Sequence, residues 1–439
     1  MPASRNRNPL IRAAAMAAFA ALPAAALTLH EAQDRLFQGN PDLAIMRLEV
    51  ERAENQVGEA RAAWSPSVDA LGSYGYVTER THLQLDLPFP LPGGTHIDRP
   101  LGDNDKAEVG VDATWALFTG FARGRNVDAR KAGLRSRDAQ MRGARNQMSL
   151  RLAALFHAWQ LAGSQAACQE KLLVHARESE RQLHDFVKAG TAVRSRALGA
   201  QAKAKAVEVD LLAAQNARDS LAYEVLALLG GEGDSLALVA DTSLPAEPDW
   251  NTGSATAARP DAEALDAGAD QARLAAKALE GQRLPQLYGM AGLRYANPGV
   301  NLAGDEFMGY GIAGLQLKWN LFDGARNRSQ RGQLDVQARV LSEQKRKLQG
   351  DWRKSMSTAR LQYARWAAQY EAAQASREAA RAASADLQKQ VDAGVATAAD
   401  WLEARNSEAR AELAMEQART MQRLARLQWE YASGKELRF

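Results

Sequence analysis

Residues 115–126 read WALFTGFARGRN, and residues 319–328 read WNLFDGARNR. Both stretches contain Trp-x-Leu-Phe-x-Gly, and the second begins 204 positions after the first. In each case an alternating apolar and polar stretch precedes the motif, and a long, charged, alanine-rich stretch follows it. The motif therefore predicts, twice in one chain, a strand that ends at a glycine turn and leads into a long helix.

Other pairs of motifs extend this repetition over the chain. Asn-Pro-Asp at 40–42 has a counterpart in Arg-Pro-Asp at 259–261, an offset of 219. Lys-Ala-Gly at 188–190 matches Asp-Ala-Gly at 392–394, an offset of 204. The chain is a tandem duplication. The first copy carries 15 extra residues, which we expect within 82–100 as a long loop, because this stretch is rich in Pro and Gly.

The hydrophobic periodicity predicts the same elements in both copies. Apolar residues alternate with polar ones before each Trp-x-Leu-Phe-x-Gly and in one earlier stretch of each copy, as in a sheet that water wets on one side. After the motif the period changes to that of a helix. The helices are expected over 30–63, 121–187, 194–230, 259–283, 324–391 and 397–432. Each of the two longest would extend about 100 Å.

The first 26 residues are typical of a secretory signal. Arg5, Arg7 and Arg12 form a basic start, residues 13–22 are apolar, and Ala24-Ala25-Ala26 offers a cleavage site. Without these arginines the chain has 52 basic and 52 acidic residues, so its charge gives no reason to expect nucleic acid as a partner. Cys168 is the one cysteine, which excludes an internal disulfide.

Catalytic and metal-binding patterns are not found. The six histidines include no pair at helical i, i+4 spacing and no metal-type cluster. The Gly-rich stretch 230–233 has no Lys-Ser/Thr after it, so it is not a phosphate loop. We therefore expect no enzyme activity, no cofactor and no metal.

The set of motifs, in this order, resembles the TolC family of outer-membrane efflux proteins over about residues 28–433. The resemblance implies a mixed α+β membrane protein: a homotrimer whose 12-stranded β-barrel, four strands per chain, continues into a long periplasmic α-helical barrel. The residues support one part independently. Four strands leave open edges that lipid does not tolerate, so the chain must oligomerise.

The resemblance also implies a division of the chain and a direction for the strands. The expected parts are a signal peptide (1–26), a first repeat (27–230), an equatorial linker (231–258), a second repeat (259–433) and a C-terminal tail (434–439). Side chains expected to face lipid are Val68, Ala70, Val111, Leu287 and Leu317. Those expected to face the lumen are Asp69, Asp112 and Lys318.

Three groups of candidate site residues follow from the resemblance. The strand-to-helix exits are Trp115, Phe118, Gly120, Trp319, Phe322 and Gly324, with both tryptophans at the membrane interface. The periplasmic gate ring is Asp400 and Glu403, three apart on one helix face. The helical tips, which would contact the adaptor, carry Gly190, Val193, Arg194, Arg196, Gly394 and Val395.

The tips also depart from the family's pattern. Val391 and Ala396 stand where an aromatic residue and an arginine often latch the second turn. Arg194 and Arg196 stand in the first tip, where an acidic partner would be expected. A basic first tip and an acidic second tip would instead pair across the helices. Exposed pairs of this kind contribute only about 0–1 kcal/mol each.

The expected function is that of a passive outer-membrane exit channel of a tripartite efflux or type I secretion system. Its partners would be two further copies of the chain, a periplasmic adaptor protein, an inner-membrane transporter and outer-membrane lipid. The alternative is a periplasmic structural coiled-coil protein that has no membrane barrel.

Overall fold

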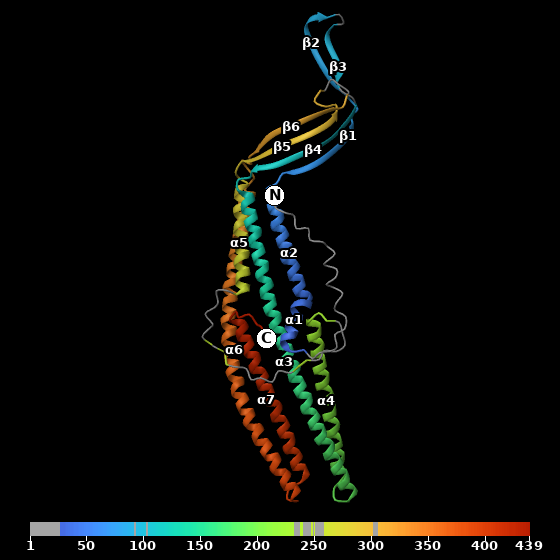
Figure 1. Cartoon of the computed structure of the whole chain (residues 1–439), viewed down its shortest axis with the longest axis vertical. Helices are drawn as coiled ribbons and strands as arrows, with labels where there is room; N and C mark the ends of the chain where they lie inside the picture. The colour runs from blue at the N-terminus through green and yellow to red at the C-terminus, as the bar shows by residue number, and fades with distance from the viewer. Residues whose placement is uncertain are drawn as a thin grey trace. The chain divides into compact units, whose positions relative to one another are not determined.

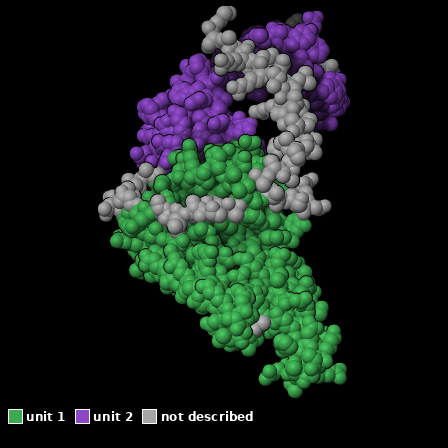
Figure 2. All heavy atoms as spheres, turned by 60° about the horizontal axis from the view of Figure 1, so that its bottom comes forward, with its two compact units in different colours: residues 1–47, 140–260, 347–439 green, residues 48–139, 261–346 purple. Residues whose placement is uncertain are grey.

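The computed structural model describes residues 27–91, 94–101, 104–231, 238–239, 247–248, 250, 259–301 and 306–439 (Figure 1). The predicted signal peptide lies outside these residues, as does most of the predicted linker. Contacts divide the chain into two compact units (Figure 2). Unit 1 comprises residues 1–47, 140–260 and 347–439, and unit 2 comprises residues 48–139 and 261–346. Each sequence repeat thus contributes to both units.

The four long helices reproduce the duplication. α3 (Ala122–Lys188) and α6 (Arg326–Asp392) have 67 residues each, and α4 (Arg194–Leu228) and α7 (Ala398–Ala432) have 35 each. The predicted helix bounds are confirmed to within two residues. Their length agrees with the alanine-rich composition, because alanine has the highest intrinsic helix propensity.

The first helical region is interrupted, whereas a continuous helix over 30–63 was expected. α1 (Leu29–Gly39) ends at Asn40, which has extended backbone angles, and α2 (Pro41–Ala62) follows. The Asn40 side chain accepts a hydrogen bond from the backbone N–H of Leu43 at 3.0 Å and donates one to the Leu228 carbonyl at 2.8 Å. Asn40 therefore starts the new helix, with Pro41 in the position where a missing N–H costs least. In the second repeat α5 (Pro260–Gly281) agrees with the predicted 259–283.

Four strands of unit 2 form one antiparallel sheet in the order β1-β4-β5-β6 (Figure 1). They are β1 (Ser67–Tyr76), β4 (Asp105–Phe118), β5 (Gln286–Asn297) and β6 (Met308–Lys318). β4, the last strand of the first repeat, thus pairs with β5, the first strand of the second repeat. The two predicted strands of each repeat are confirmed.

The predicted long loop over 82–100 is wrong. β2 (Thr81–Leu91) and β3 (Gly94–Leu101) form a two-stranded antiparallel hairpin. Cross-strand pairs stabilise it: His82 Nδ1 lies 2.6 Å from Asp98 Oδ1, and His96 Nδ1 lies 2.7 Å from Asp86 Oδ1. The pairing shifts only between Asp86 and Leu91, the interval that contains both prolines of β2. Proline disturbs the ladder there without ending the strand.

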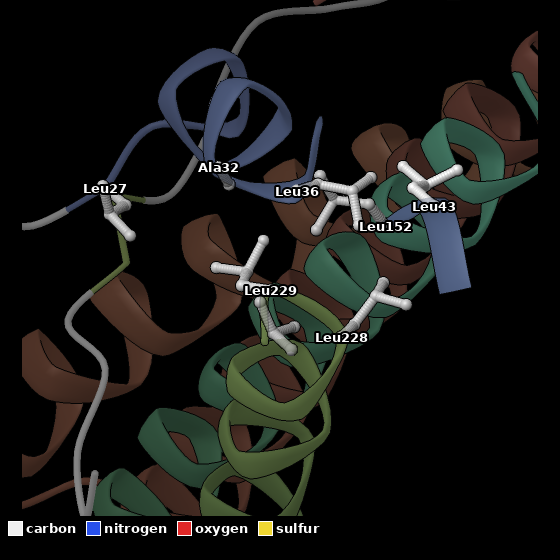
Figure 3. Close-up of a cluster of buried hydrophobic side chains, with 8 residues drawn as sticks. Leu27, Ala32, Leu36, Leu43, Leu152, Leu228 and Leu229 are labelled. Atoms are coloured by element: carbon white, nitrogen blue, oxygen red, sulfur yellow. The ribbon is translucent and has the colours of Figure 1, made fainter. Parts of the chain in front are cut away.

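Unit 1 has a leucine-rich core where α1 and α2 meet α3 and the end of α4 (Figure 3). Leu36, Leu43 and Leu152 are fully buried there. A fully buried leucine contributes about 1.5–3 kcal/mol to folding. In unit 2 the helices pack through smaller side chains, with Ala269 and Ala272 of α5 against Ala338 and Leu341 of α6. Small side chains let helices approach closely.

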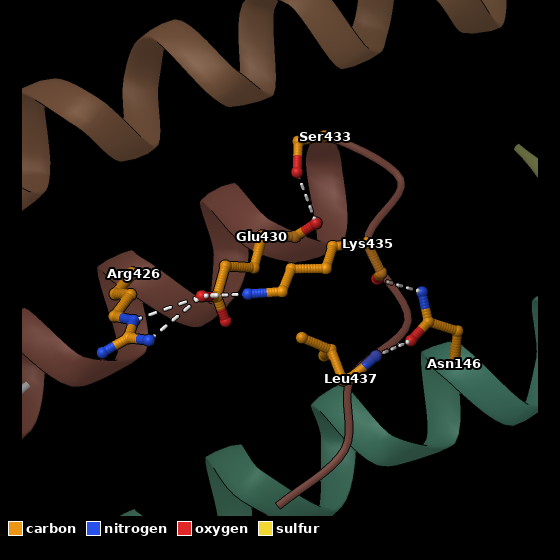
Figure 4. A network of polar contacts seen from close by, with 6 residues as sticks. All are labelled: Asn146, Arg426, Glu430, Ser433, Lys435 and Leu437. Atoms are coloured by element: carbon orange, nitrogen blue, oxygen red, sulfur yellow. Dashed lines mark hydrogen bonds and ion pairs between the residues drawn. The ribbon is translucent and has the colours of Figure 1, made fainter. Parts of the chain in front are cut away.

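The C-terminal tail folds back onto unit 1 (Figure 4). The Asn146 side chain donates to the Lys435 carbonyl at 3.1 Å and accepts from the Leu437 N–H at 2.8 Å. Glu430, the last acid of α7, accepts from Arg426 at 3.2 Å and from Lys435 at 3.1 Å. Leu437 is buried. The tail is therefore part of the fold, although its sequence carries no periodic signal.

Candidate functional site

Two glycine turns form the tips of unit 1, at the junctions α3–α4 and α6–α7 (Figure 1). Gly190 and Gly394 both have φ +73, the left-handed region that glycine adopts without strain. The two turns have matching backbone hydrogen bonds. The Gly190 N–H donates to the Val187 carbonyl at 3.0 Å, and the Gly394 N–H donates to the Val391 carbonyl at 2.9 Å. Both glycines end long helices, as the sequence predicted.

The helices that leave these two turns begin differently. Thr397 caps α7: its Oγ1 accepts from the Asp400 N–H at 3.3 Å, and the Asp400 carboxylate accepts from the Thr397 N–H at 3.2 Å and from its hydroxyl at 2.6 Å. This is a capping box, which satisfies two helix-end donors at once. Val193 precedes α4 and makes no side-chain cap. The next residue, Arg194, places a positive charge beside the positive end of the helix dipole.

The capping box accounts for the charge state of Asp400. Hydrogen bonds from the Thr397 hydroxyl and backbone N–H hold the pKa of Asp400 below its ordinary value. Asp400 remains exposed, and so does Glu403, one turn further along α7. The predicted gate residues thus share one face of a helix, but Asp400 also has a structural role that the sequence reasoning missed. Thr397, three residues before an acid and next to a helix start, was the available signal.

Glu403 faces α4 across a groove of about 250 Å³. Its Oε2 lies 4.0 Å from Nζ of Lys203. The groove is also lined by His175, and burial lowers the pKa of that imidazole. The acidic second tip therefore pairs with Lys203. Arg194 and Arg196 make no ion pair in the described chain, so the expected pairing through these arginines is not found.

The remaining tip residues are accessible. Val193 and Val395 are exposed large apolar side chains at the two turns. Arg194 and Arg196 are exposed on the first turn of α4. All six predicted tip residues therefore lie on the surface of unit 1.

The sheet has one mostly apolar face and one face that carries most of its charges, because directly paired residues share a face and successive residues alternate. The apolar face carries Val68, Ala70, Val111, Ala113, Leu287, Leu293, Leu315 and Leu317. The polar face carries Ser67, Asp69, Glu108, Asp112, Thr114, Arg294, Gln316 and Lys318, together with the apolar Leu71, Met290 and Ile312. This register confirms that the residues predicted to face lipid share one face of the sheet and that those predicted to face the lumen share the other. Which set contacts lipid stays a prediction.

An ion cluster on the polar face joins the two repeats. Arg294 of β5 pairs with Glu108 and, at 2.9 Å, with Asp112, both on β4. All three side chains are partly buried. The cluster crosses the seam between β4 and β5, the one place where strands of different repeats meet in the described sheet.

The strand-to-helix exits share an unusual backbone. Gly120 and Phe121 have φ of 62° and 64°, and Gly324 and Ala325 have φ of 62° and 67°. Two successive left-handed residues turn the chain sharply from strand to helix. Glycine tolerates this conformation, whereas the following residue adopts it at a cost of about 1–3 kcal/mol.

Each exit tryptophan binds the start of its own repeat's strand pair. Trp115 Nε1 donates to the Trp64 carbonyl at 2.8 Å, and Trp319 Nε1 donates to the Arg283 carbonyl at 3.1 Å. Phe118 packs edge-on against Phe121, with ring centroids 5.5 Å apart, and Phe322 is exposed. The position of these aromatic residues at a membrane interface stays a prediction.

The sequence reasoning also missed a buried arginine in unit 1. Arg259 Nη1 donates to the carbonyls of Tyr431, at 3.0 Å, and Ala432, and its guanidinium lies 3.9 Å from the ring centre of Trp352. It therefore neutralises the C-terminal end of α7. Only the contact between distant segments reveals this role.

Two classes of site are not found in the part of the chain that the structure describes. No group of three or more His, Cys, Asp or Glu side chains could hold a metal ion there. Among the same residues, no helix combines the length and the apolar character that a membrane span requires.

Comparison with known proteins identifies the fold. Three solved structures are similar along most of their length: VceC from Vibrio cholerae, CmeC from Campylobacter jejuni and MtrE from Neisseria gonorrhoeae. VceC is 17% identical with a TM-score of 0.73, covering 93% of this chain and 96% of VceC. CmeC is 14% identical with a TM-score of 0.71, covering 92% and 85%. MtrE is 16% identical with a TM-score of 0.70, covering 93% and 89%.

The sequence itself matches a family. No curated protein matches the chain, but the family described as outer membrane efflux protein matches residues 32–231 and 252–435. These ranges include both repeats, with their strands, exits and tips. The match supports the prediction of an outer-membrane channel without enzymatic activity over that of a periplasmic coiled-coil protein. The chain belongs to the outer membrane efflux protein family.

Proposed function

We propose that three copies of this chain form a passive exit duct across the outer membrane. The observation that carries the proposal is the sheet of unit 2, whose apolar and polar faces are both largely exposed in the single chain. A sheet with these two faces suits a barrel wall between lipid and water. Its edge strands, β1 and β6, require partners in lipid, and three sheets of four strands would close a twelve-stranded barrel.

In this arrangement the apolar face contacts lipid and the polar face lines the lumen. Val68, Val111 and Leu317 then point outward, and Asp69, Asp112 and Lys318 point inward. Exposed Trp115 lies near the end of β4 and exposed Trp319 directly after β6, where amphipathic aromatic side chains favour the membrane interface.

The tips of unit 1 form the periplasmic mouth in this proposal. Asp400 and Glu403 from three copies would place six carboxylates around one opening, which attracts cations and repels anions. The exposed Val193 and Val395, with Arg194 and Arg196, offer apolar and basic contacts for a periplasmic adaptor. The adaptor would join the duct to an inner-membrane transporter that supplies both the energy and the substrate. Efflux and type I secretion both fit such a duct.

Purified protein in detergent and planar bilayers tests the proposal. We expect a native mass of three processed chains and stepwise ionic conductance after insertion. A mass of one or two chains, or failure of the trimer to conduct, would contradict it.

A further inference from the structure

We propose that arginines around the strand-to-helix junctions of unit 2 bind the phosphates of anionic phospholipids in the membrane leaflet that faces the periplasm. The site consists of Arg61, Arg283, Arg326 and Arg328, which we call the junction arginines. The inference rests on the proposed function in one respect, that the sheet of unit 2 crosses the outer membrane. It adds the class of lipid that the chain selects and the residues that select it.

The junction arginines lie beside one end of the sheet. β1 and β5 begin at the end where β4 and β6 finish (Figure 1). Arg61 is in the last turn of α2, and Arg283 lies between α5 and β5. Arg326 and Arg328 are in the first turn of α6, shortly after the end of β6. Each is therefore close in the chain to a strand end on this side of the sheet.

These four side chains are exposed and unpaired, unlike two arginines of α3. None of the junction arginines makes an ion pair, a side-chain hydrogen bond or a cation–π contact with another described residue. Arg123 instead donates to the carbonyls of Ala63, at 3.1 Å, and Leu117, at 3.2 Å. Arg125 donates to the Lys277 carbonyl at 2.7 Å. The fold uses the donors of these two arginines internally and leaves those of the junction arginines available to a partner outside the chain.

Comparison of the repeats shows that the fold does not require the two arginines of α6. The offset of 204 aligns Arg326 with Ala122 and Arg328 with Gly124. Asn327, between the two arginines, is buried and donates a hydrogen bond to α5. Each arginine lies about 100° around the helix from it, so neither shares this contact. The first repeat folds with small residues at both positions, and a role outside the fold accounts for the two charges.

The residues that precede this pair suit the boundary between hydrocarbon and lipid headgroups. Leu321 and Phe322 are 79% and 87% exposed, and Trp319 is exposed just before them. Apolar and aromatic side chains insert at this boundary, and basic side chains beside them reach the phosphates. Helical side chains also tilt toward the N-terminus of their helix, which directs Arg326 and Arg328 toward the sheet. An apolar anchor and a phosphate-binding pair therefore follow one another in the chain.

The two ends of the sheet differ in charge, which favours one leaflet. At the end away from the helices, the described residues beside the strand ends include three acids, Glu79, Asp105 and Glu306, and two bases, Arg80 and Lys106. The end beside the helices has the junction arginines and the positive N-terminal ends of α3 and α6. Anionic headgroups are attracted to this second end. Because the proposed function places the helices in the periplasm, the favoured leaflet is the one that faces it.

A phosphodiester is the ligand that suits these side chains. A guanidinium donates two parallel hydrogen bonds to phosphate oxygens and keeps its charge at any physiological pH. Phosphatidylglycerol has a net negative charge at this group, whereas phosphatidylcholine also carries a compensating cation. Asp323, the acid nearest in the chain to the α6 pair, accepts instead from the backbone N–H of Asn327 at 3.0 Å. The phosphate of an anionic lipid can therefore bind the α6 pair without displacing an existing ion pair.

Lipid binding to the purified, delipidated full-length protein tests the inference. Phosphatidylglycerol is titrated into the detergent-solubilised protein, with phosphatidylcholine of the same acyl chains as the reference, and native mass spectrometry counts the lipids retained. The first test variant is Arg326→Ala with Arg328→Ala, which gives the second repeat small residues where the first repeat has them. The matched control is Arg194→Ala with Arg196→Ala, which removes two exposed charges from a tip of unit 1.

Two more variants complete the set. Arg61→Ala with Arg283→Ala removes the other two junction arginines. Arg326→Lys with Arg328→Lys keeps the charge but not the paired hydrogen bonds, so its lipid retention should lie between that of the parent and that of the alanine pair. Soluble glycerol 3-phosphate in excess distinguishes a lipid site from a site for free phosphate, because it lacks the acyl chains that would insert beside Leu321 and Phe322.

We expect the parent protein to bind phosphatidylglycerol at least tenfold more tightly than phosphatidylcholine. Each arginine near the surface should contribute about fivefold, so either alanine pair should remove most of the preference. The tip control should keep the preference, and glycerol 3-phosphate should not displace the lipid.

Equal binding of the two lipids by the parent would overturn the inference, as would full preference in both alanine pairs. Displacement by glycerol 3-phosphate, or an equal loss in the tip control, would show a soluble-anion site or a general effect of charge. Altered ion selectivity in planar bilayers with unchanged lipid retention would place the arginines in the lumen and also overturn it. If the parent still conducts as a trimer in any of these cases, the proposed function stands and only the lipid site is lost.

Discussion

The indole of Trp115 donates a 2.8 Å hydrogen bond to the carbonyl of Trp64, so the end of one strand is tied to the start of its neighbour. Trp319 makes the same contact with Arg283, whose position corresponds to that of Trp64 in the second repeat. This shared hydrogen bond explains why the motif begins with tryptophan in both repeats. A large ring that carries one donor can reach across the base of the strand pair.

Replacing either tryptophan by phenylalanine should therefore weaken the base of the sheet. Trp115→Phe and Trp319→Phe keep most of the ring but remove the N–H donor, which costs about 0.5–1.5 kcal/mol each. The thermal unfolding midpoint of the detergent-solubilised protein measures the loss. Trp366→Phe is the matched control, since the Trp366 indole makes no hydrogen bond to any other described residue. Equal shifts for all three variants would show that the hydrogen bond is unimportant.

The two exit glycines allow a second matched comparison. Both have φ +62, so alanine at either position carries the left-handed penalty of about 1–2 kcal/mol. A Cβ at Gly324 would meet no atom within 4 Å, whereas a Cβ at Gly120 would lie 2.2 Å from the Gly281 carbonyl oxygen. We expect Gly324→Ala to assemble with a modest loss of stability and Gly120→Ala to reduce the yield of folded protein severely. Similar yields for the two variants would refute the close approach.

Arginine substitutions test the orientation of the sheet. Val111→Arg places a charge on the apolar face and should cost about 2–4 kcal/mol near mid-membrane. Thr114→Arg lies on the polar face and should cost far less. The amount of heat-resistant trimer in outer-membrane fractions reports both effects. Equal assembly defects would contradict the assignment of lipid and lumen.

The gate prediction needs variants that separate charge from helix capping. Asp400→Asn with Glu403→Gln removes both charges while leaving an oxygen to accept from Thr397. We expect this double variant to lose block by trivalent cations added on the periplasmic side. Thr397→Ala removes the capping hydroxyl and keeps both charges, so block should persist. Unchanged block and ion selectivity in the double variant would remove these residues from the gate.

The Asp400 carboxylate should lose its charge only at a lower pH than an ordinary aspartate does. Because the pKa of Asp400 is held below its ordinary value of 3.8, the carboxylate stays charged where an unpaired aspartate would already be half protonated. The stability that the capping box gives is present above the unfolded-state value and is lost as the pH falls through the lower folded-state value. In Thr397→Ala the cation block should therefore disappear at a higher pH than in the parent. Titration curves that coincide would show that the Thr397 hydrogen bonds do not set the charge of Asp400.

Arg259 should be important for unit 1. Arg259→Ala removes a charged donor to two α7 carbonyls, which contributes about 1.5–3 kcal/mol, and a cation–π contact with Trp352, which contributes about 2 kcal/mol. The expected loss of stability is about 3.5–5 kcal/mol. Arg259→Lys keeps the positive charge but lacks the planar guanidinium, so its stability should lie between that of the parent and that of Arg259→Ala. Chemical denaturation in detergent measures both. A parental midpoint for Arg259→Ala would show that the contact contributes nothing.

The sequence by itself determined the duplication, the four strands of the sheet, and the bounds of α5 and of the four long helices. These features are local or periodic: the alternation around Val111, the change of period after Trp115 and the glycines at 190 and 394 can all be read within a few turns of chain. Period two and period 3.6 correspond directly to strand and helix geometry. Asp400 and Glu403 were chosen from the family resemblance and their spacing, and their role as a gate stays a prediction.

Tertiary structure decided what distant segments do to one another. The partner of Glu403 is Lys203 and not Arg194, because packing of α4 against α7 sets which side chains meet. The stretch 82–100 forms a hairpin with cross-strand His–Asp pairs, and its turn-like composition does not show this pairing between β2 and β3. Arg259 and the tail gain their roles only where α7 ends beside them. Contacts between residues hundreds of positions apart depend on the folded arrangement, and no local pattern in a single sequence encodes them.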